Sequence, residues 1–269
     1  MGIDRRGFLK VSGLTAVGLA SGSVAKVFGN ETDPADSLTD SLGAHEALDH
    51  TIPENASRWA MVIDLRKCQE HEDCNDCSQA CHVTHNVPAF DNRKDEVKWI
   101  WKESFAHTFH DQEHAHQRHD LGHAPTLVLC NHCDNPPCVK VCPTGATWKR
   151  KNDGIVMMDW HRCIGCRYCV AACPYGSRSF NWRDPRSHIA KINPQYPTRT
   201  RGVVEKCTFC EERVSRGKIP ACVEACKYGA LHFGDLDDPE SNVRRLLQEN
   251  FTLRRKPGLG TNPEVYYIV

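Results

Sequence analysis

The spacing of the cysteines constrains this chain more than any other feature. The sequence of 269 residues contains 16 cysteines, which fall into four groups of four with none left over. The groups are Cys68, Cys74, Cys77 and Cys81; Cys130, Cys133, Cys138 and Cys142; Cys163, Cys166, Cys169 and Cys173; and Cys207, Cys210, Cys222 and Cys226. A unit that recurs along the chain predicts that all the cysteines serve one kind of site, around which the fold is organised.

The third group indicates what that site is. It reads C-x2-C-x2-C-x3-C-P from Cys163 to Pro174. In this bacterial ferredoxin pattern, three thiolates hold one [4Fe–4S] cluster and the fourth ligates a second cluster. Gly165 is expected to let the loop backbone come close to the cluster. The other groups have longer loops and are interpreted as variants of the same design, so 16 ligands at four per cluster predict four [4Fe–4S] clusters.

Zinc and disulfides are the alternatives for so many cysteines. Paired C-x2-C units also bind structural zinc, but zinc sites do not usually place a fourth Cys and a Pro at this spacing. Disulfides suit an exported protein, yet C-x2-C-x2-C packs thiols too densely for independent bridges of good geometry. The sequence contains no C-x2-C-H for haem attachment, and no G-x-G-x-x-G after a strand for a nicotinamide or flavin. The pattern therefore favours iron–sulfur ligation.

Short apolar runs lead into several cysteine groups and predict strands over residues 62–65, 126–129 and 154–158. The last two cysteines of each group are four residues apart, a spacing that suits the start of a helix. Strand, cysteine loop, short helix and strand form a βαβ-like unit, two of which build a ferredoxin domain, so the predicted fold class is α+β. The sequence after Pro239 predicts an amphipathic helix, followed by a terminal strand over 265–269.

The first 25 residues have the features of an export signal. Arg5 and Arg6 precede Gly-Phe-Leu-Lys and an uncharged stretch over 11–25 that is rich in small residues. This pattern resembles a twin-arginine signal, which addresses proteins for export in the folded state. The alternative is a chance Arg-Arg before an ordinary signal or a retained anchor. Residues 26–57 are acidic with little apolar periodicity, which predicts a solvated linker.

Charge and histidine content add two expectations. The chain has 34 basic and 34 acidic side chains, which argues against nucleic acid as the main partner. Residues 107–124 form a His-rich insertion, for which partner contact or a solvated segment is favoured over metal or haem binding. Its histidines are His107, His110, His114, His116, His119 and His123. Lys206, Arg162 and Arg167 lie beside cluster cysteines, where they would either raise redox potentials or be solvated charges.

These motifs together resemble a known family, the four-cluster ferredoxin-type subunits of respiratory oxidoreductases such as polysulfide, nitrite and dimethyl sulfoxide reductases. The resemblance covers about residues 58–235. Its most specific phrases are Cys207-Thr-Phe-Cys-Glu-Glu-Arg, the run Gly217-Lys-Ile-Pro-Ala-Cys222-Val-Glu-Ala-Cys226, and the C-terminal Gly260-Thr-Asn-Pro-Glu-Val-Tyr-Tyr. With the export signal and Cys81-His-Val-Thr-His-Asn-Val-Pro, the chain most resembles members that serve transmembrane complexes of sulfur and sulfate metabolism.

The resemblance implies two bacterial-ferredoxin-like domains with a pseudo-twofold relation, inserted loops and a C-terminal extension over 236–269. One domain would comprise 58–106 plus 200–235, and the other 125–199. Within each domain the fourth cysteine of one group would ligate its partner group's cluster. The implied ligand sets are Cys68, Cys74, Cys77 and Cys226; Cys207, Cys210, Cys222 and Cys81; Cys130, Cys133, Cys138 and Cys173; and Cys163, Cys166, Cys169 and Cys142. The departures from the pattern are the widened Cys68–Cys74 loop and the missing prolines after Cys81 and Cys226.

The implied function is electron transfer at the periplasmic or outer face of the cytoplasmic membrane, after export in the folded state. The chain would relay single electrons between a multi-span quinone-reactive membrane subunit and a further redox subunit, for which a cytochrome c is one candidate. It would be no enzyme and would bind no small-molecule substrate of its own. The rivals are a soluble polyferredoxin shuttle, the equivalent subunit of another respiratory reductase, and a reductase in its own right. The last is disfavoured because every cysteine has a cluster role, which leaves no open metal site or nucleophile.

Overall fold

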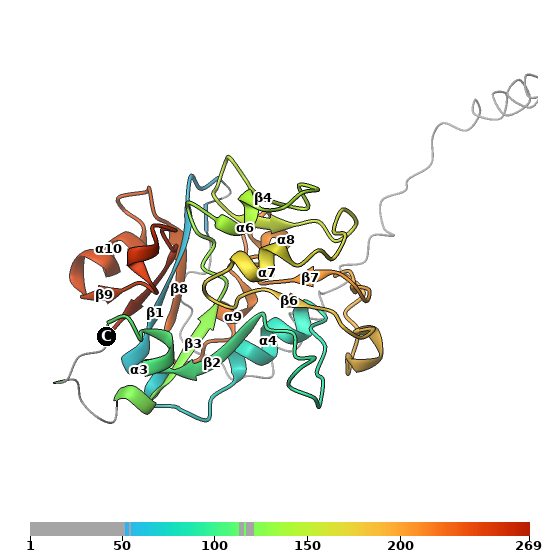
Figure 1. The fold of residues 1–269 in the computed structure, drawn as a ribbon. Helices are drawn as coiled ribbons and strands as arrows, with labels where there is room; N and C mark the ends of the chain where they lie inside the picture. The colour runs from blue at the N-terminus through green and yellow to red at the C-terminus, as the bar shows by residue number, and fades with distance from the viewer. Residues whose placement is uncertain (1–51, 54, 113–115, 117–120) are drawn as a thin grey trace, which may run out of the picture. The chain divides into compact units, whose positions relative to one another are not determined.

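A four-stranded mixed sheet lies at one side of the ferredoxin-like elements in the computed structural model, which describes residues 52–53, 55–112, 116 and 121–269 (Figure 1). The sheet order is β8 (Leu231–Asp235), β1 (Trp59–Asp64), β10 (Val265–Ile268) and β9 (Thr252–Leu253). Strand β1 pairs antiparallel with β8 and parallel with β10. The predicted signal over 1–25 and most of the predicted linker over 26–57 lie outside the described residues.

Strand β1 is central because its sequence, WAMVID, is buried on both faces. The predicted terminal strand is confirmed as β10, which forms an inner strand of this sheet. The predicted C-terminal helix is confirmed as α10 (Asn242–Glu249), with Ser241 Oγ accepting from the backbone N–H of Arg244 at its N-terminus. Val243 of this helix is fully buried against the sheet, and a Cβ at Gly234 would lie 3.2 Å from its Cγ2. The C-terminal residues are therefore an integral part of the core.

Three two-stranded ladders make up the rest of the sheet structure. They are β2 (Ile100–Ser104) with β3 (Pro125–Leu129), β4 (Thr147–Lys149) with β5 (Val156–Met158), and β6 (Ser179–Phe180) with β7 (Val204–Glu205). The strands predicted near 62–65, 126–129 and 154–158 correspond to β1, β3 and β5. The β2–β3 and β6–β7 ladders each join residues on the two sides of a predicted domain boundary, at 124 and 199. All described residues belong to one compact unit.

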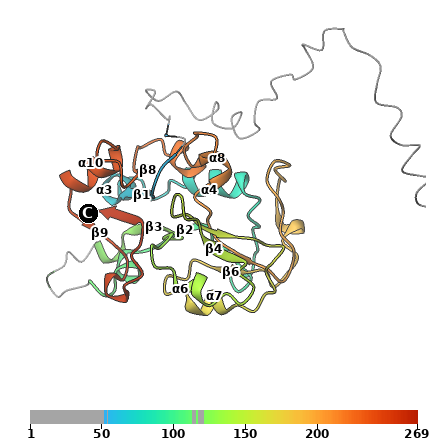
Figure 2. The ribbon, with the colours of Figure 1, turned by 90° about the horizontal axis from the view of Figure 1, so that it is seen from above.

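Short helices follow the cysteine loops. They are α3 (Leu65–Gln69), α4 (Asp76–Thr84), α6 (Pro137–Lys140), α7 (Tyr168–Ala172), α8 (Glu211–Val214) and α9 (Ala221–Glu224). Helix α4 packs against α9, and α6 packs against α7. Figure 2 shows α6 and α7 side by side. Because each pair joins two cysteine groups, the first group meets the fourth and the second meets the third.

The remaining helical turns are α5 (Phe105–Thr108), η1 (Leu121–His123), η2 (Arg186–His188) and η3 (Pro257–Leu259). The largest apolar core combines β1, β3, β8 and β10 with several cysteines. Across the described residues, no helix combines the length and the apolar character needed to cross a membrane.

Candidate iron–sulfur centres

All sixteen cysteines are free thiols, and each is buried or half-buried. This is not the arrangement expected if they formed disulfides. In the structure, thiols of different sequence groups are neighbours: Cys226 lines one pocket with Cys68, Cys74 and Cys77. We number the ligand sets that the family resemblance implies 1 to 4: set 1 is Cys68, Cys74, Cys77 and Cys226; set 2 is Cys81, Cys207, Cys210 and Cys222; set 3 is Cys130, Cys133, Cys138 and Cys173; set 4 is Cys142, Cys163, Cys166 and Cys169.

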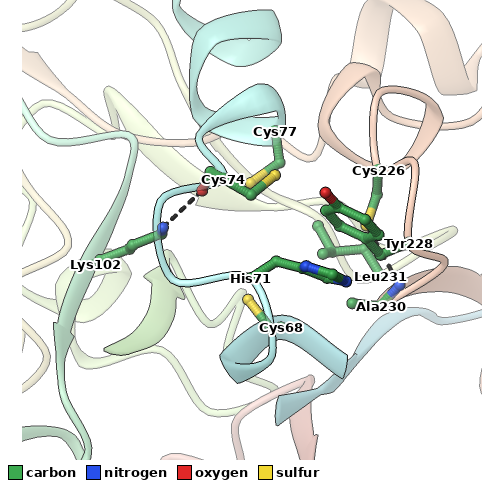
Figure 3. A pocket seen from close by; sticks show the side chains of 9 residues that line it. All are labelled: Cys68, His71, Cys74, Cys77, Lys102, Cys226, Tyr228, Ala230 and Leu231. Atoms are coloured by element: carbon green, nitrogen blue, oxygen red, sulfur yellow. Dashed lines mark hydrogen bonds between the residues drawn. The ribbon is translucent and has the colours of Figure 1, made fainter. Parts of the chain in front are cut away.

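Set 1 lines a single pocket (Figure 3). Cys68 follows β1 on α3, Cys74 lies in the loop before α4, and Cys77 lies on α4. Cys226 comes from the turn between α9 and β8, on the opposite wall of the pocket. Burial, followed by the neighbouring Cys226 and Cys68 thiols, raises the pKa of the Cys77 thiol to about 12. Four thiols from two distant stretches of chain therefore face one small space.

The widened loop between Cys68 and Cys74 is held in place by side chains that line the same pocket. Lys102 Nζ, on β2, donates to the carbonyl oxygens of Glu72 at 2.5 Å and Cys74 at 2.6 Å. His71 stacks on the ring of Tyr228, with 3.5 Å between ring centroids. Both rings line the pocket beside the thiols. The extra residues of this loop therefore supply a specific packing contact beside the thiols of set 1.

Set 2 is the most deeply buried, and all four of its thiols are buried. Burial raises the pKa of Cys81 well above its usual value, and the adjacent Cys207, Cys210 and Cys222 thiols raise it further. Phe209 and Cys210 adopt left-handed backbone conformations, with φ of 57° and 52°, which fold the loop tightly. In this turn the backbone N–H of Phe209 donates to Cys207 Sγ at 3.4 Å.

A histidine and a carboxylate flank set 2, and the sequence pattern did not reveal them. The ring Nδ1 of His85 lies 3.6 Å from Cys81 Sγ and 2.9 Å from the Cys81 carbonyl. Its Nε2 lies 2.9 Å from Glu212 Oε1. Burial alone would raise the pKa of Glu212, but the hydrogen bond and charge of His85 lower it. The only signal in the sequence is position: His85 is four residues after Cys81, and Glu212 is two after Cys210.

Set 3 lies against two buried cations, Arg178 and Lys206. Burial, together with the neighbouring thiols of Cys130, Cys173 and Cys138, raises the pKa of Cys133 to about 12. Arg178 Nη2 donates to Cys138 Sγ at 3.1 Å and is oriented by Thr147 Oγ1 at 2.8 Å. Lys206, which the sequence singled out, is fully buried.

Set 4 is nearer the surface. Cys142, Cys163 and Cys169 share one apolar cluster with Cys138 of set 3, and Cys166 lies in the same loop as Cys163. Burial alone would raise the pKa of Cys142. Hydrogen bonds to its sulfur lower it instead, and the backbone of Thr147 makes the strongest of these, followed by Thr144. Gly165 has φ of +70°, and a Cβ there would lie 2.3 Å from the carbonyl oxygen of Gly202. In the structure, the close approach that requires glycine is thus to the backbone of another loop.

The four sets follow one another in space. The pKa of Cys222 in set 2 is raised first by burial and also by nearby thiols, including Cys77 of set 1. The pKa of Cys207 in set 2 is raised by burial and next by the nearby Cys130 of set 3. Cys169 of set 4 is close to Cys138 of set 3, which also raises a pKa already raised by burial. The order is therefore set 1, set 2, set 3, set 4.

The donors in each set fit iron–sulfur clusters. Each set offers four thiols, the soft ligands on which [4Fe–4S] cubanes are held. Backbone N–H groups already point at sulfur: Ala221 donates to Cys210 Sγ at 3.3 Å and Ala230 to Cys226 Sγ at 3.3 Å. Such donors stabilise the negative charge of a bound cluster.

The histidines of the insertion and the two arginines near the third cysteine group were also candidates from the sequence. His107 is exposed and pairs with Glu103 Oε2 at 2.9 Å, while His114 and His119 lie outside the described residues. Among the described residues, one group has its side-chain donors close enough together to hold a single metal ion. It consists of His85, Cys210 and Glu212, and none of these residues belongs to the His-rich insertion. The side chain of Arg162 is 68% exposed, and Arg167 lies over the rings of Trp182 and Phe180.

Comparison with known proteins agrees with this geometry. A family model described as a 4Fe-4S dicluster domain matches residues 125–236. The Hdr-like menaquinol oxidoreductase iron-sulfur subunit 1 of Archaeoglobus fulgidus is 43% identical over 233 residues, which cover 78% of this chain and 82% of that protein. The menaquinone reductase iron-sulfur cluster-binding subunit of Nitratidesulfovibrio vulgaris is 37% identical, covering 78% and 88%. The arsenate respiratory reductase iron-sulfur subunit ArrB of a Shewanella species is 38% identical, covering 78% and 96%.

The ferredoxin-type fold and the thiol sets define an iron–sulfur protein of the 4Fe–4S class. Within that class, the chain belongs to the family of ferredoxin-type iron–sulfur subunits of respiratory oxidoreductases. It is an electron-transfer subunit and not the catalytic subunit of its complex, so it has partner subunits.

Proposed function

We propose that this chain relays single electrons through four [4Fe–4S] clusters, held by sets 1 to 4, on the outer face of the cytoplasmic membrane. When bound, each cluster supplies reversible one-electron redox chemistry. The chain's own part is to hold the clusters in order, keep water from the inner ones and present the outer ones to partners. The ligand pairing and the pseudo-twofold relation of two ferredoxin modules belong to this proposal.

The observation that carries the proposal is the graded burial along the ordered sets. Set 2 is wholly buried, while set 1 and set 4 at the two ends each contain half-buried thiols. At the set 1 end these are Cys68, Cys74 and Cys226, and at the set 4 end Cys142, Cys163 and Cys166. An electron can thus enter near one surface and leave near another.

The partners we propose are a multi-span quinone-reactive membrane subunit and a further redox subunit, such as a cytochrome c. The support is that two relatives are named for menaquinol oxidation or menaquinone reduction. The proposed setting is sulfur or sulfate respiration. The support is the resemblance of the export signal, the complete set of cysteines and the run Cys81-His-Val-Thr-His-Asn-Val-Pro to the iron–sulfur subunit of the Dsr transmembrane complex. The alternatives are another respiratory reductase or a soluble shuttle.

Co-purification tests the fixed partnership. An affinity-tagged chain is expected to be extracted from detergent-solubilised membranes together with a multi-span subunit. Adding a menaquinol analogue anaerobically should then bleach the visible absorbance of the clusters, and an inhibitor of quinone sites should block it. Recovery of the fully loaded chain alone in the soluble fraction, with no reduction by quinol in membranes, would favour the shuttle.

Export is tested separately. Replacing Arg5 and Arg6 by lysine should retain the chain inside the cell, whereas Lys10→Arg should leave export unchanged. Protease added to spheroplasts should degrade the wild-type chain and spare the retained variant. Equal protection of all three proteins would contradict the outer-face location.

A further inference from the structure

Two buried cations lie at the two junctions of set 3, and among the described residues neither forms an ion pair with a carboxylate. Lys206 is 0% exposed and Arg178 is 4% exposed. Long basic side chains are almost never this buried unless a negative group compensates them. In this chain the negative groups within reach are the thiolates that hold the clusters.

Lys206 lies between set 2 and set 3. Its Nζ donates to the carbonyl oxygens of Val156 and, at 2.6 Å, of Cys207. Burial lowers the pKa of Lys206, and the thiolates of Cys130 in set 3 and Cys207 in set 2 oppose that effect. Two carbonyl acceptors fix the ammonium group in place at this junction.

Arg178 lies between set 3 and set 4. One guanidinium nitrogen contacts Cys138 of set 3 at 3.1 Å, and the charge also acts on Cys169 of set 4. The same nitrogen, Nη2, also donates to Thr147 Oγ1 at 2.8 Å, and Nη1 donates to Met158 Sδ at 3.7 Å. The guanidinium therefore reaches ligands of both sets.

The surroundings of set 2 differ. Its Cys210 faces the carboxylate of Glu212, which raises a pKa that burial has already raised. Glu212 itself is held by His85. Set 2 thus shares one buried cation that has no carboxylate partner and also has an acidic neighbour, whereas set 3 has such a cation on each side.

Reduction of a [4Fe–4S] cluster adds one negative charge to the site. A fixed positive charge a few ångströms away stabilises the reduced form, and burial keeps salt and water from screening it. Protein charge and hydrogen bonds to sulfur are among the levers that set cluster potentials.

We propose that Lys206 and Arg178 supply fixed positive charges that make the cluster held by set 3 the most easily reduced of the four. This inference rests on the proposed function, because it presupposes the four clusters. An electron moving along the ordered sets would then rest at set 3, one step inward from the half-buried thiols of set 4.

The test is an EPR-monitored redox titration of the anaerobically purified, cluster-loaded protein, with iron per chain measured first. Arg178→Gln and Lys206→Gln remove the charge and keep a hydrogen-bond donor. Both should shift the same, highest-potential component, lowering its reduced-to-oxidised ratio at a fixed potential at least about tenfold, which is about 59 mV for one electron. Arg178→Gln should also shift the set 4 component, and Lys206→Gln the set 2 component.

Two further variants separate charge from structure. Arg178→Lys keeps the charge and should titrate close to wild type. Arg162→Gln removes an exposed charge one residue before Cys163 and should shift nothing. A wild-type titration in either buried variant that retains its iron overturns the proposal, as does an equal shift in Arg162→Gln. If Arg178→Gln loses iron, Lys206→Gln decides alone. Wild-type protein with too little iron for four clusters would instead contradict the proposed function.

Discussion

At the scale of single residues, a buried ion pair links stretches of chain that lie far apart in the sequence. Arg199 Nη2 and Glu205 Oε2 are 2.6 Å apart, and their side chains are 1% and 0% exposed. Glu205 also accepts hydrogen bonds from Trp99 Nε1 at 2.9 Å and Asn181 Nδ2 at 2.5 Å. Arg199 Nη1 donates to the carbonyl of His85, beside set 2. A charge this buried is stable only while its partner is present.

Arg199→Met should therefore destabilise the protein by about 3–5 kcal/mol, because it leaves the Glu205 carboxylate buried without its cation. Chemical unfolding of the loaded protein measures the loss. The exposed pair of Arg186 and Asp184 gives the control, since Arg186→Met should leave the unfolding midpoint unchanged. Equal effects of the two substitutions would show that burial does not decide the strength of these pairs.

The thiols give a pH prediction. Burial raises the pKa of Cys77, Cys133 and Cys207 to about 12 in the folded chain without clusters. Only thiolates bind iron, so cluster uptake must release protons. Iron incorporated per chain in anaerobic reconstitution should increase from pH 7 to pH 8.5. Uptake that is flat or falls over this range would mean that thiol deprotonation does not limit assembly.

At the scale of elements, the loop of Gly165 is where backbone packing is tightest. Gly165→Ala introduces a Cβ that would lie 2.3 Å from the Gly202 carbonyl, in addition to the strain of φ +70°. Gly176 has a similar φ of +64° but open space around its Cα. Gly176→Ala should thus cost only the left-handed strain, about 1–2 kcal/mol.

Gly165→Ala should cost about 1–3 kcal/mol more, since the two loops must move apart. It should also lower the iron content, because Cys163 and Cys166 flank this glycine. Unfolding curves and iron analysis of the two variants, side by side, check both statements. If the two variants are equally stable, the contact with Gly202 is not what requires glycine.

The sequence predicted those elements whose own residues determine them. Strands β1, β3, β5 and β10 are apolar runs, and α10 has a capping serine and apolar residues at helical spacing. Short ladders such as β6–β7 have only two residues per strand, so their pairing depends on distant chain and could not be predicted. The same holds for Arg178 and His85, whose contacts with Cys138 and Cys81 arise from tertiary packing.

At the scale of the whole molecule, each of the four sets combines cysteines from two groups that lie far apart in the sequence. Set 1 and set 2 each combine the first and fourth cysteine groups, and set 3 and set 4 combine the second and third. The helix pairs α4–α9 and α6–α7 bring these groups together. Since each set depends on two remote segments, binding of the clusters and folding of the chain should be coupled.

The central claim is that these sets hold four [4Fe–4S] clusters. Its most direct test is the iron, acid-labile sulfide and zinc content per chain of anaerobically purified protein, with EPR of the reduced form. If four clusters are bound, the protein should contain about sixteen irons and sixteen sulfides, with interacting [4Fe–4S] signals and no stoichiometric zinc. About eight irons, or zinc in place of iron, would contradict it and would mean that set 1 and set 2, with their widened loops, serve another purpose.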